Sequence, residues 1–561
     1  SFIISRLVEA LRGQSGSAAS GEISRRQAAR FLMQATFGAT IEEIDRVTSL
    51  GYEAWIDDQI QTQPAYLHEP YIAALWQDHR DGLREMPNYE KGRSGVPGSN
   101  ATTPFMRGAL QKPDQLRQRM AFALSQILVA SRQEDTLQDH PQGMCNFYDI
   151  FVSNAFGNFE DILWEVSMHP VMGRYLSHIG NQKADPSINR FPDQNYAREI
   201  MQLFTIGLWE LHPNGERILD NIGEPIPTYT NETIKELAKV FTGIWFGDLS
   251  WGSGGGDDPD YLNAMSMHAD RHDFVAKPIF PDRGLPGRGA INFPARTESK
   301  ANGLQDIRDA VAMLFQHPNT PPFICKQLIQ FLVTSNPSPA YVERAQNVFA
   351  NNGSGVRGDL GAVAKAILLD PEARELRFCL KPDFGKMKEP VLRVTALARA
   401  FNLAKDPNFV WWNSDSLQDT AFQVPTLAPS VFNYFRPDYQ TPGIVRERSL
   451  VSPVFEIMDS YTSIAFPNYL WDRMVDGFLG GREETDTAVF GLDYADVSFL
   501  AADSNALADR MNLLFCGGSM TADTRALIIT AVEQLPANPL QERALLAAYL
   551  TLCSPDGAIL K

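Results

Sequence analysis

Cysteine is scarce in this chain of 561 residues, and the few thiols lie far apart. No two cysteines form a C-x-x-C pair, and none has cysteine or histidine neighbours at the spacing of a structural zinc site. We therefore expect no zinc site of that kind. The number of thiols is odd, and we interpret most of them as buried free thiols that behave as small apolar groups: Cys145, Cys325, Cys379, Cys516 and Cys553.

Positive charge is also in short supply. The chain carries 50 Lys and Arg against 67 Asp and Glu, a net charge of −17, and it has no basic cluster. Binding to nucleic acids or to anionic membrane surfaces needs Lys and Arg to neutralise phosphates, so we predict no nucleic-acid partner. No apolar run approaches the ~18 residues that span a bilayer, and no transmembrane segment is expected.

Several motifs of well-known enzyme classes are missing as well. The chain has no Walker A or Rossmann glycine pattern and no G-x-S-x-G elbow of a serine hydrolase. The glycine-rich and acidic residues 252–260 have the composition of a calcium-binding loop, but they lack the EF-hand spacing and its distal glutamate. Calcium binding and a simple mobile loop both remain as interpretations of this stretch.

What the chain does contain is ordinary for a folded protein, with 44% hydrophobic and 21% charged residues. Apolar residues recur at helical spacing through most of the sequence, and no run alternates convincingly as a strand does. We predict a mainly α fold: a large multi-helix domain at 25–555 with long irregular loops and at most a few short strands. The loop insertions are expected at about 81–104, 246–303 and 406–445.

A flexible N-terminal tether is expected at 1–24, because residues 13–21 consist mostly of Gly, Ser and Ala. The first residues lack the charged region and apolar core of a complete signal peptide. That pattern is compatible with a mature end left after cleavage or with an internal start. In the helical part, we expect two helices within 22–60 and another at 452–464.

One predicted helix, at 195–208 with Asp193 as its N-cap, has an unusual polar side. That side has no lysine and carries amide, carboxylate and guanidinium groups, which build hydrogen-bonded networks: Asn195, Arg198, Glu199 and Gln202. A buried network that braces neighbouring helices is one interpretation. The other is the floor of a site, with Glu199 as a general acid/base, Arg198 as an anion clamp, and the two amides as substrate contacts.

A second candidate is the only stretch rich in both His and Asp, at 268–273. His268, Asp270 and His272 are candidate ligands for a divalent metal such as Zn, Mn or Fe, because imidazole and carboxylate suit these ions. His272 and Asp273 are also candidate acid/base groups. The alternative is a loop histidine held by an aspartate, with Lys277 paired nearby.

These two candidates form one site if the loop folds over the helix. Asn195, Arg198, Glu199, His272 and Asp273 would then line a cleft able to bind a metal, an acidic sugar or a sulfate ester, with Lys277 as a further substrate contact. Separately, Trp411 and Trp412 begin an irregular aromatic region. Such rings can stack on sugars, or they can plug the helical core beneath a long segment.

Several motifs of this chain resemble, in order, those of the large bacterial family named domain of unknown function 1800. They are the stretches 30–38, 115–127, 195–205, 241–243, 429–433 and 514–518. The resemblance spans roughly 25–555. One residue departs from it: Thr233 stands where the family has an acidic residue three places after a helix-capping threonine, so we expect the capping box at Thr230 to be incomplete.

The resemblance implies an exported protein that is periplasmic, attached to the cell surface or extracellular. It also implies a protein partner, because members are commonly encoded beside domain of unknown function 1501, which resembles sulfatases and alkaline phosphatases. Our first hypothesis is a metal-assisted or acid/base hydrolase acting on envelope or extracellular polysaccharide or its esters. The second is a non-catalytic scaffold for the phosphatase- or sulfatase-like partner.

Overall fold

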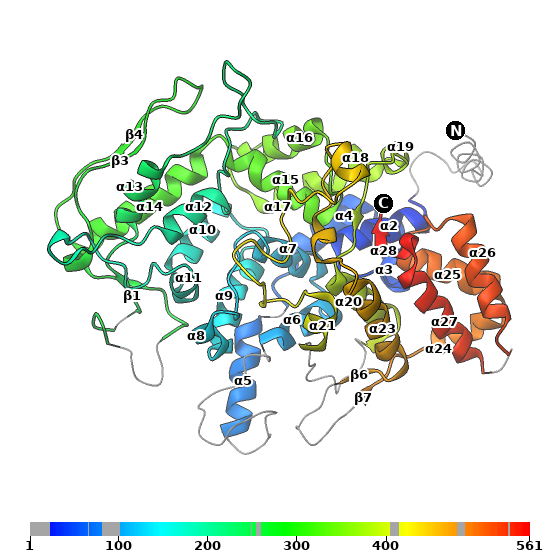
Figure 1. Ribbon diagram of the computed structural model, residues 1–561. Helices are drawn as coiled ribbons and strands as arrows, with labels where there is room; N and C mark the ends of the chain where they lie inside the picture. The colour runs from blue at the N-terminus through cyan, green and yellow to red at the C-terminus, as the bar shows by residue number, and fades with distance from the viewer. Residues whose placement is uncertain are drawn as a thin grey trace.

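The computed structural model describes residues 23–65, 67–80, 101–247, 249–253, 260–403, 415–479, 489–536 and 539–561. Helices dominate these ranges, and the strands within them pair as two-stranded sheets of two to four residues each. The predicted mainly α fold is confirmed (Figure 1). Across the same ranges, no helix has both the length and the apolar character needed to cross a bilayer.

The first part of the chain is entirely helical. Its helices are α2 (Arg25–Ala35), α3 (Ile41–Leu50), α4 (Tyr52–Gln61), α5 (His68–Arg80), α6 (Thr102–Gln111), α7 (Gln115–Ser125), α8 (Asp135–Gln138), α9 (Pro141–Ser153), α10 (Phe159–Met168) and α11 (Pro170–Tyr175). The prediction of two helices within 22–60 is wrong, because there are three. Gly51 adopts a left-handed φ of 86°, which ends α3 and lets α4 start at the next residue.

The middle of the chain mixes helices with short strands. It contains η2 (Pro186–Ile188), α12 (Asn195–Gln202), α13 (Asn231–Val240), β1 (Ile244–Trp245), β2 (Ser266–Met267), η3 (Ala269–Arg271), β3 (Lys277–Phe280), β4 (Ile291–Phe293), α14 (Lys300–Gln316), α15 (Thr320–Leu332), α16 (Pro339–Ala350), α17 (Leu360–Leu369), α18 (Pro371–Arg374), α19 (Leu376–Cys379), β5 (Lys386–Met387) and α20 (Pro390–Ala400).

The last part returns to helices. It contains α21 (Asp415–Ala421), α22 (Ile444–Glu447), η5 (Pro453–Ile457), α23 (Thr462–Val475), β6 (Phe478–Leu479), β7 (Val489–Phe490), α24 (Ala495–Ser498), η6 (Phe499–Ala502), α25 (Ser504–Cys516), α26 (Ala522–Glu533), α27 (Leu540–Cys553), α28 (Pro555–Ala558) and β8 (Ile559–Leu560). The helix predicted at 452–464 is wrong. The Asp459 carboxylate accepts hydrogen bonds from the backbone N–H of Tyr461 and Thr462, which breaks the chain between η5 and α23.

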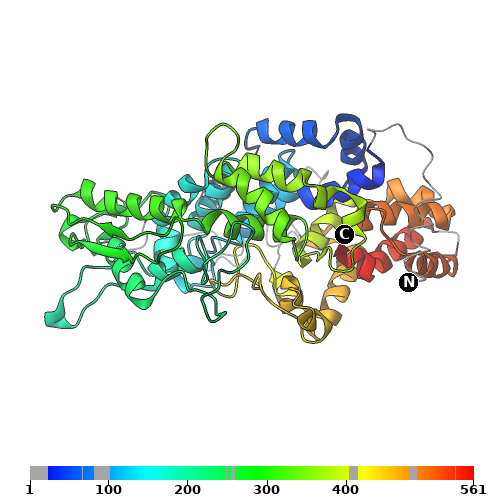
Figure 2. The same cartoon turned by 90° about the horizontal axis from the view of Figure 1, so that it is seen from above.

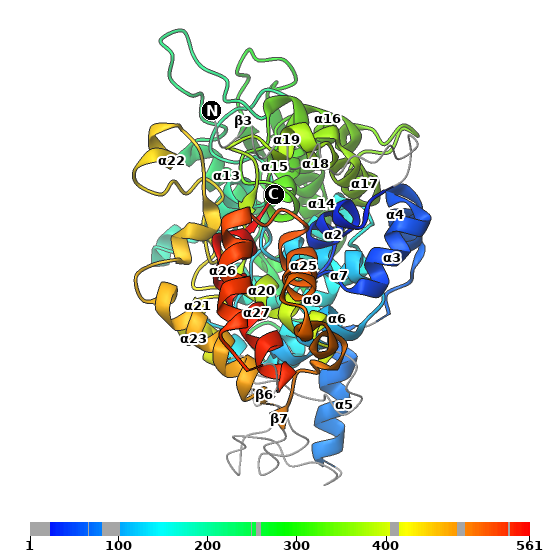
Figure 3. The same cartoon turned by 90° about the vertical axis from the view of Figure 1, so that its right-hand side faces the viewer.

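The molecule is longer in one direction than in the others. Figures 1 and 2 place β3, β4, α13 and α14 at one end and the C-terminal helices α24–α27 at the other. Figure 3, viewed from the C-terminal end, shows α25, α26 and α27 in front of the central helices. Segments far apart in sequence meet there, since α2 packs on α25 and β8 pairs with β5 through Lys386 and Leu560.

Helix α12 is shorter than the predicted 195–208. The backbone N–H groups of Ile206 and Gly207 both donate to the carbonyl of Met201, which closes the helix. Gly207 has a φ of 70°, and its α-carbon faces the ring of Phe323 so closely that a Cβ would lie 2.8 Å from it. Only glycine fits this turn, and the chain leaves the helix direction there.

After α12, residues 208–228 fold as two successive hairpin turns. Three backbone hydrogen bonds join its segments: Glu210 N–H to Ile226, Ile218 N–H to Glu210, and Ile226 N–H to Ile218, at 2.8, 2.7 and 3.0 Å. We call residues 208–228 the meander. The backbone of Glu210 is bonded to both of the other segments, at Ile218 and at Ile226. These backbone bonds fix the position of Glu210 without help from its side chain.

The meander leads into α13, where the prediction of an incomplete capping box is wrong. The Thr233 hydroxyl accepts from the Thr230 N–H at 3.3 Å, and the Thr230 hydroxyl accepts from the Thr233 N–H at 3.4 Å. A threonine hydroxyl therefore takes the role that an acidic side chain has in the usual box.

The β3–β4 hairpin covers part of α13, and α13 packs in turn on α14. The register of the β3–β4 hairpin pairs Lys277 with Phe293 and Phe280 with Ile291, with an irregularity after Pro278. Proline has no N–H to donate to the ladder, which accounts for a short and interrupted pairing. The 246–303 region therefore contains the β3–β4 hairpin and also strand β2, which pairs with β1 just before the region.

Candidate functional site

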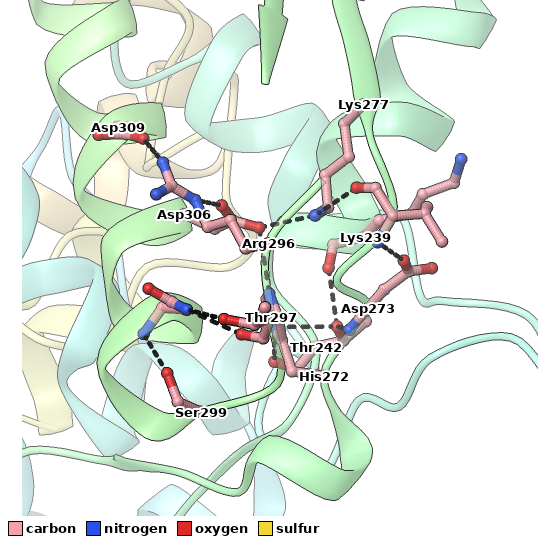
Figure 4. Close-up of polar contacts among 12 residues, drawn as sticks. Lys239, Thr242, His272, Asp273, Lys277, Arg296, Thr297, Ser299, Asp306 and Asp309 are labelled. Atoms are coloured by element: carbon pink, nitrogen blue, oxygen red, sulfur yellow. Dashed lines mark hydrogen bonds and ion pairs between the residues drawn. The ribbon is translucent and has the colours of Figure 1, made fainter. Parts of the chain in front are cut away.

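A cluster of buried charges holds β3 and the preceding loop onto α14 (Figure 4). Lys277 Nζ lies 2.6 Å from Asp306 Oδ2, and Arg296 Nε lies 2.5 Å from Asp306 Oδ1. The side chains of Lys277 and Asp306 are completely buried. A desolvated ion pair of this kind is favourable only if its remaining polar atoms are also satisfied, and Lys277 Nζ makes a further bond to the carbonyl of Val275 at 3.1 Å.

His272 belongs to the same cluster. Its Nδ1 lies 2.8 Å from the carbonyl oxygen of Thr242, and its Nε2 lies 3.3 Å from Asp306 Oδ2. Burial alone would raise the pKa of Asp306, but hydrogen bonds from His272 and Lys277 outweigh it and hold that pKa below its ordinary value. Both ring nitrogens of His272 are engaged with protein oxygens in a fully buried position.

Asp273 has a local backbone role. Its N–H donates to the Thr242 hydroxyl at 3.0 Å, and its carboxylate accepts from the N–H of Val275 at 3.0 Å. The second bond closes a turn of the kind that aspartate commonly makes two residues ahead of itself. The carboxylate of Asp273 thereby shapes the loop that delivers Lys277 to Asp306.

The structure does not bring the three candidate metal ligands together. His268 lies with its ring against Trp251, Asp270 is exposed and paired with Arg271 at 3.0 Å, and the His272 ring is occupied as described. Over the ranges that the structure describes, no group of three or more His, Cys, Asp and Glu side chains is arranged to hold a metal ion.

The polar face of α12 is a separate feature. Glu199 is buried, its Oε2 has no hydrogen-bond partner among the described residues, and burial raises its pKa, with Arg198 acting in the opposite direction. Gln202 accepts a 2.8 Å hydrogen bond from the Tyr229 hydroxyl. Arg198 and Asn195 are exposed, and the Asn195 amide donates to the Ser177 hydroxyl at 3.4 Å.

The two features are linked through Asn181 rather than by direct contact. The Asn181 side chain accepts from the Asp193 N–H at 2.8 Å and donates to the Phe241 carbonyl at 3.0 Å. The backbone carbonyl of Asn181 accepts from the Gly243 N–H at 2.8 Å. Within the described residues, no hydrogen bond or ion pair joins Glu199 to His272, so a single cleft containing both stays a prediction.

Some candidates fall outside the description. Trp411 and Trp412 lie outside the described residues, as do 254–259 of the glycine-rich stretch and 81–100 of the first loop insertion. In the aromatic region that follows, Tyr434 and Phe435 are buried, and the Tyr434 hydroxyl bonds to the carbonyl of Val424. These two rings fill the core, whereas Phe432 is 46% exposed.

A cavity of about 380 Å³ lies between the meander, the β3–β4 hairpin and the end of α14. Its apolar wall includes Phe280, Ile291, Phe293 and Met313, and its polar wall includes Glu210, Arg283, Arg288 and His317. Ligand pockets commonly have this size and this combination of apolar walls with a few polar groups. Sequence reasoning missed this site, because its walls come from segments up to a hundred residues apart.

Glu210 is the buried acid of the cavity. It forms an ion pair with Arg288, while its Oε1 is buried without a partner among the described residues. Burial raises the pKa of Glu210, and Arg288 partly offsets that rise. Arg288 is held in turn by the carbonyl of Leu211 at 2.9 Å and by Asn319 Oδ1 at 3.0 Å.

His317 faces Phe280 at the end of α14, with 5.9 Å between the ring centroids. Burial, reinforced by Arg288 and other nearby arginines, lowers the pKa of His317 to about 3, so the ring is neutral at pH 7. Its Nδ1 accepts from the N–H of Asn319 at 3.1 Å. The ring proton therefore lies on Nε2.

Asn319 connects the parts around this cavity. Its amide donates to the carbonyls of Ile206 and Trp209 at 2.9 and 2.8 Å, and its Oδ1 accepts from the Leu211 N–H at 3.0 Å. It is completely buried. One side chain therefore ties the end of α12, the start of the meander and Arg288 together, which fixes the polar wall of the cavity.

Comparison with known proteins gives one match. A family model described as "Protein of unknown function (DUF1800)" matches residues 30–558, and the chain belongs to this family. No curated protein and no solved structure matches.

Proposed function

We propose that this member of the family hydrolyses an ester carried by envelope or extracellular polysaccharide, using Glu210 as the acid/base. The observation that carries the proposal is the unpartnered Oε1 of a buried carboxyl beside a cavity of about 380 Å³. Buried polar atoms are normally paired, and unpaired ones with a raised pKa are common where an acid or base works. This location replaces our initial emphasis on Glu199 and His272 as the reactive pair.

The chemistry assigned to Glu210 is general base catalysis followed by general acid catalysis. The carboxylate takes a proton from a water molecule as the water oxygen attacks the ester carbonyl carbon. It then returns that proton to the alcohol oxygen as the carbon–oxygen bond breaks, which yields a carboxylic acid and a free sugar hydroxyl. A raised pKa strengthens the carboxylate as a base, and the ion pair with Arg288 orients it.

His317 supplies a hydrogen-bond donor for the negative charge that develops on the ester oxygen. The neutral ring carries its proton on Nε2, because the backbone of Asn319 occupies Nδ1. Fixed donors aimed at a developing oxyanion typically account for about 3–4 kcal/mol of barrier lowering each. Arg283, whose Nε is buried without a partner among the described residues, is a second donor in the same wall.

The apolar wall suits a sugar ring. Phe280 and Phe293 line the cavity together with the charged groups, and aromatic faces pack against the C–H faces of sugars while polar groups bind the hydroxyls. The volume is at the lower end of the usual range for ligand sites, which favours one or two sugar units rather than a long chain segment.

The test is acetate release from acetylated oligosaccharides, with 4-nitrophenyl acetate as a chromogenic probe. Glu210→Gln should lower kcat by about 10²–10⁴-fold when both proteins are assayed well below their unfolding temperatures, and its own unfolding temperature should fall because Arg288 loses its counter-ion. Glu224→Gln is the matched control, because Glu224 is an exposed meander residue outside the cavity lining. Equal rates for Glu210→Gln and the parent would refute the role of Glu210.

Glu199 remains the second location for the same chemistry. Its unpartnered Oε2 and raised pKa support it, with Arg198 as an anion clamp and Asn195 and Gln202 as substrate contacts. A Glu199→Gln variant that loses acetate release while Glu210→Gln keeps it would move the reaction to α12.

The alternative function is a scaffold for a phosphatase- or sulfatase-like partner of the domain of unknown function 1501 family, in an exported location. Exposed apolar side chains on the meander favour it: Ile222 is 84%, Leu219 53% and Leu208 47% exposed. Large apolar side chains exposed together often mark protein contacts. Co-purification from envelope fractions of a native host tests it, with Ile222→Asp and Leu219→Asp expected to abolish the complex.

A further inference from the structure

Four cationic side chains line one small internal cavity, far from the polysaccharide site proposed above. They come from helix α7, from β5 and the residue after it, and from helix α20: Arg119, Lys386, Lys388 and Arg393. All four are at least nine-tenths buried. Such a concentration of positive charge is unexpected in a chain whose net charge is −17.

Apart from the contact of Lys386 with Glu389, the hydrogen bonds of these cations within the described residues go to neutral backbone carbonyl groups. Arg119 and Lys386 both donate to the carbonyl of Phe331, at 2.6 and 2.7 Å, so their charges lie side by side. Lys388 donates to the carbonyl of Phe515 at 2.5 Å, and Arg393 donates to that of Leu552. A carbonyl satisfies a donor hydrogen but does not cancel a charge.

Among the described residues, one carboxylate, Glu389, is paired with this group. Its Oε1 lies 3.4 Å from Lys386 Nζ, and its Oε2 accepts from the side-chain amides of Gln126 and Gln423 at 3.1 and 2.9 Å. One carboxylate cannot neutralise four cations. Burial lowers the pKa of Lys386 and of Lys388 to about 8, because removal from water disfavours the charged form.

Several donors on these side chains have no acceptor. Nε and Nη1 of Arg119 and Nε of Arg393 are buried without hydrogen-bond partners among the described residues. The cavity that these side chains line has a volume of about 20 Å³, enough for one water-sized occupant. The unsatisfied groups are all donors, so the occupant they require is an acceptor, and the charge they carry requires it to be negative.

We propose that this cavity is a binding site for a monatomic anion of the halide class, with chloride as its occupant. A halide is close to water in size and accepts hydrogen bonds from every direction, so it can meet guanidinium and ammonium donors at once. Sulfate, phosphate and carboxylates are too large for the space. Apart from Thr36, the remaining wall is apolar and includes Phe37, Leu392 and Leu514.

The bound anion would join parts of the chain that are distant in sequence. The cavity is lined by residues from α2, α7, β5, α20, α25, α27 and β8. An anion at their meeting point is a structural ligand, and by mass action it stabilises the folded protein by an amount that grows with the logarithm of its concentration above the dissociation constant. This inference does not depend on the esterase proposal, because none of the residues involved lines the larger cavity.

The test uses the full chain at constant ionic strength, with sodium chloride replacing sodium gluconate. We expect the unfolding temperature to rise by a few degrees with chloride or bromide and to remain flat in gluconate, which is too large to enter. Crystals grown in sodium bromide should show an anomalous bromine peak in contact with Arg119 and Lys388. An unchanged unfolding temperature together with no bromine peak would overturn the proposal. The buried lysines would then be tolerated because they are neutral in the folded protein.

A variant pair adds specificity. Lys388→Met should lose the chloride-dependent rise, whereas Lys235→Met, at a lysine whose side chain is 52% exposed, should keep it. A full chloride response in Lys388→Met would contradict the assignment of that side chain to the site. If Lys388→Met does not fold, the bromide experiment on the unaltered chain decides the question.

Discussion

Lys277 Nζ lies 2.6 Å from Asp306 Oδ2, and neither side chain is exposed to solvent. This pair joins the first residue of β3 to the middle of α14, with His272 and Arg296 on the same carboxylate. Both β3 and α14 also supply walls of the cavity that contains Glu210. The buried cluster therefore helps to hold the cavity walls in place. The polar atoms of Lys277, Asp306 and His272 bond to other protein atoms and do not line the cavity.

Removing the carboxylate should be costly. Asp306→Asn leaves Lys277 and Arg296 without their shared counter-ion in a buried position, and breaking such a pair typically costs about 3–5 kcal/mol. We expect that loss in the free energy of unfolding measured with urea. Asp309→Asn is the control, since Asp309 also pairs with Arg296 but its side chain is 32% exposed. Similar losses in the two variants would contradict the central role of Asp306.

The same carboxylate predicts an acid-sensitive stability. The folded-state pKa of Asp306 is below its ordinary value, because hydrogen bonds from His272 and Lys277 outweigh the effect of burial. A depressed pKa contributes stability above the unfolded value of about 3.9, and this stability is lost as pH falls through the folded value. Urea unfolding at a series of pH values should show a smaller acid loss in Asp306→Asn than in the parent.

Gly243 should not tolerate a side chain. Its φ is 74°, and a Cβ would lie 2.7 Å from the carbonyl oxygen of His268 and 2.7 Å from the nitrogen of His272. Gly223 in the meander has a φ of 88° and open space around it, so alanine there incurs only the left-handed backbone cost of about 1–2 kcal/mol. Gly243→Ala should lose clearly more stability than Gly223→Ala by thermal unfolding. Equal losses would mean that the loop at 268–272 adapts.

Glu199→Gln should stabilise the protein at neutral pH. Burial raises the pKa of Glu199, so ionisation of this side chain opposes folding as pH rises through that value. An uncharged amide of the same shape removes that penalty, for a gain of about 1 kcal/mol. The gain should vanish below about pH 4, where the parent is also protonated. A stability loss at neutral pH would show that the carboxylate has a cationic partner in solution.

The esterase proposal predicts a specific pH profile. Glu210 acts as a base only when ionised, and burial raises its pKa, so kcat/KM should fall on acidification with a midpoint above the ~4.3 of free glutamate. Arg288→Gln should move that midpoint further up, because it removes the neighbouring positive charge. If the parent and Arg288→Gln have the same midpoint, the group that titrates in the pH profile is not Glu210.

The helical fold could be predicted from the sequence because apolar periodicity is a local signal. Helices dominate the described residues as predicted, and the five cysteines are free thiols, four of them buried. The failures lie where one backbone angle or one hydroxyl decides, as at Gly51 and Thr233. Periodicity carries no information about these.

The sites were harder to predict because their partners are distant in sequence. His272 and Lys277 stand out in the sequence as part of a local cluster, yet their common partner Asp306 lies on a helix whose sequence is ordinary. An acidic residue beside Ile307 and Ala310 on a buried face was the one available signal. The cavity offered even less, since Glu210 and Arg288 are separated by 78 positions and each lies in a turn-rich stretch.

The pairing of Lys386 with Leu560 has a consequence for the newly made protein. Strand β5 leaves the ribosome about 170 residues before its partner β8, a delay on the order of ten seconds or more at usual rates of synthesis. During that delay Lys388 lacks its acceptor, the carbonyl of Phe515, and the cavity lacks the wall that Leu552 and Leu560 supply. A chaperone that shields this segment until β8 has been made would raise the yield of native protein, whereas faster elongation would shorten the vulnerable interval.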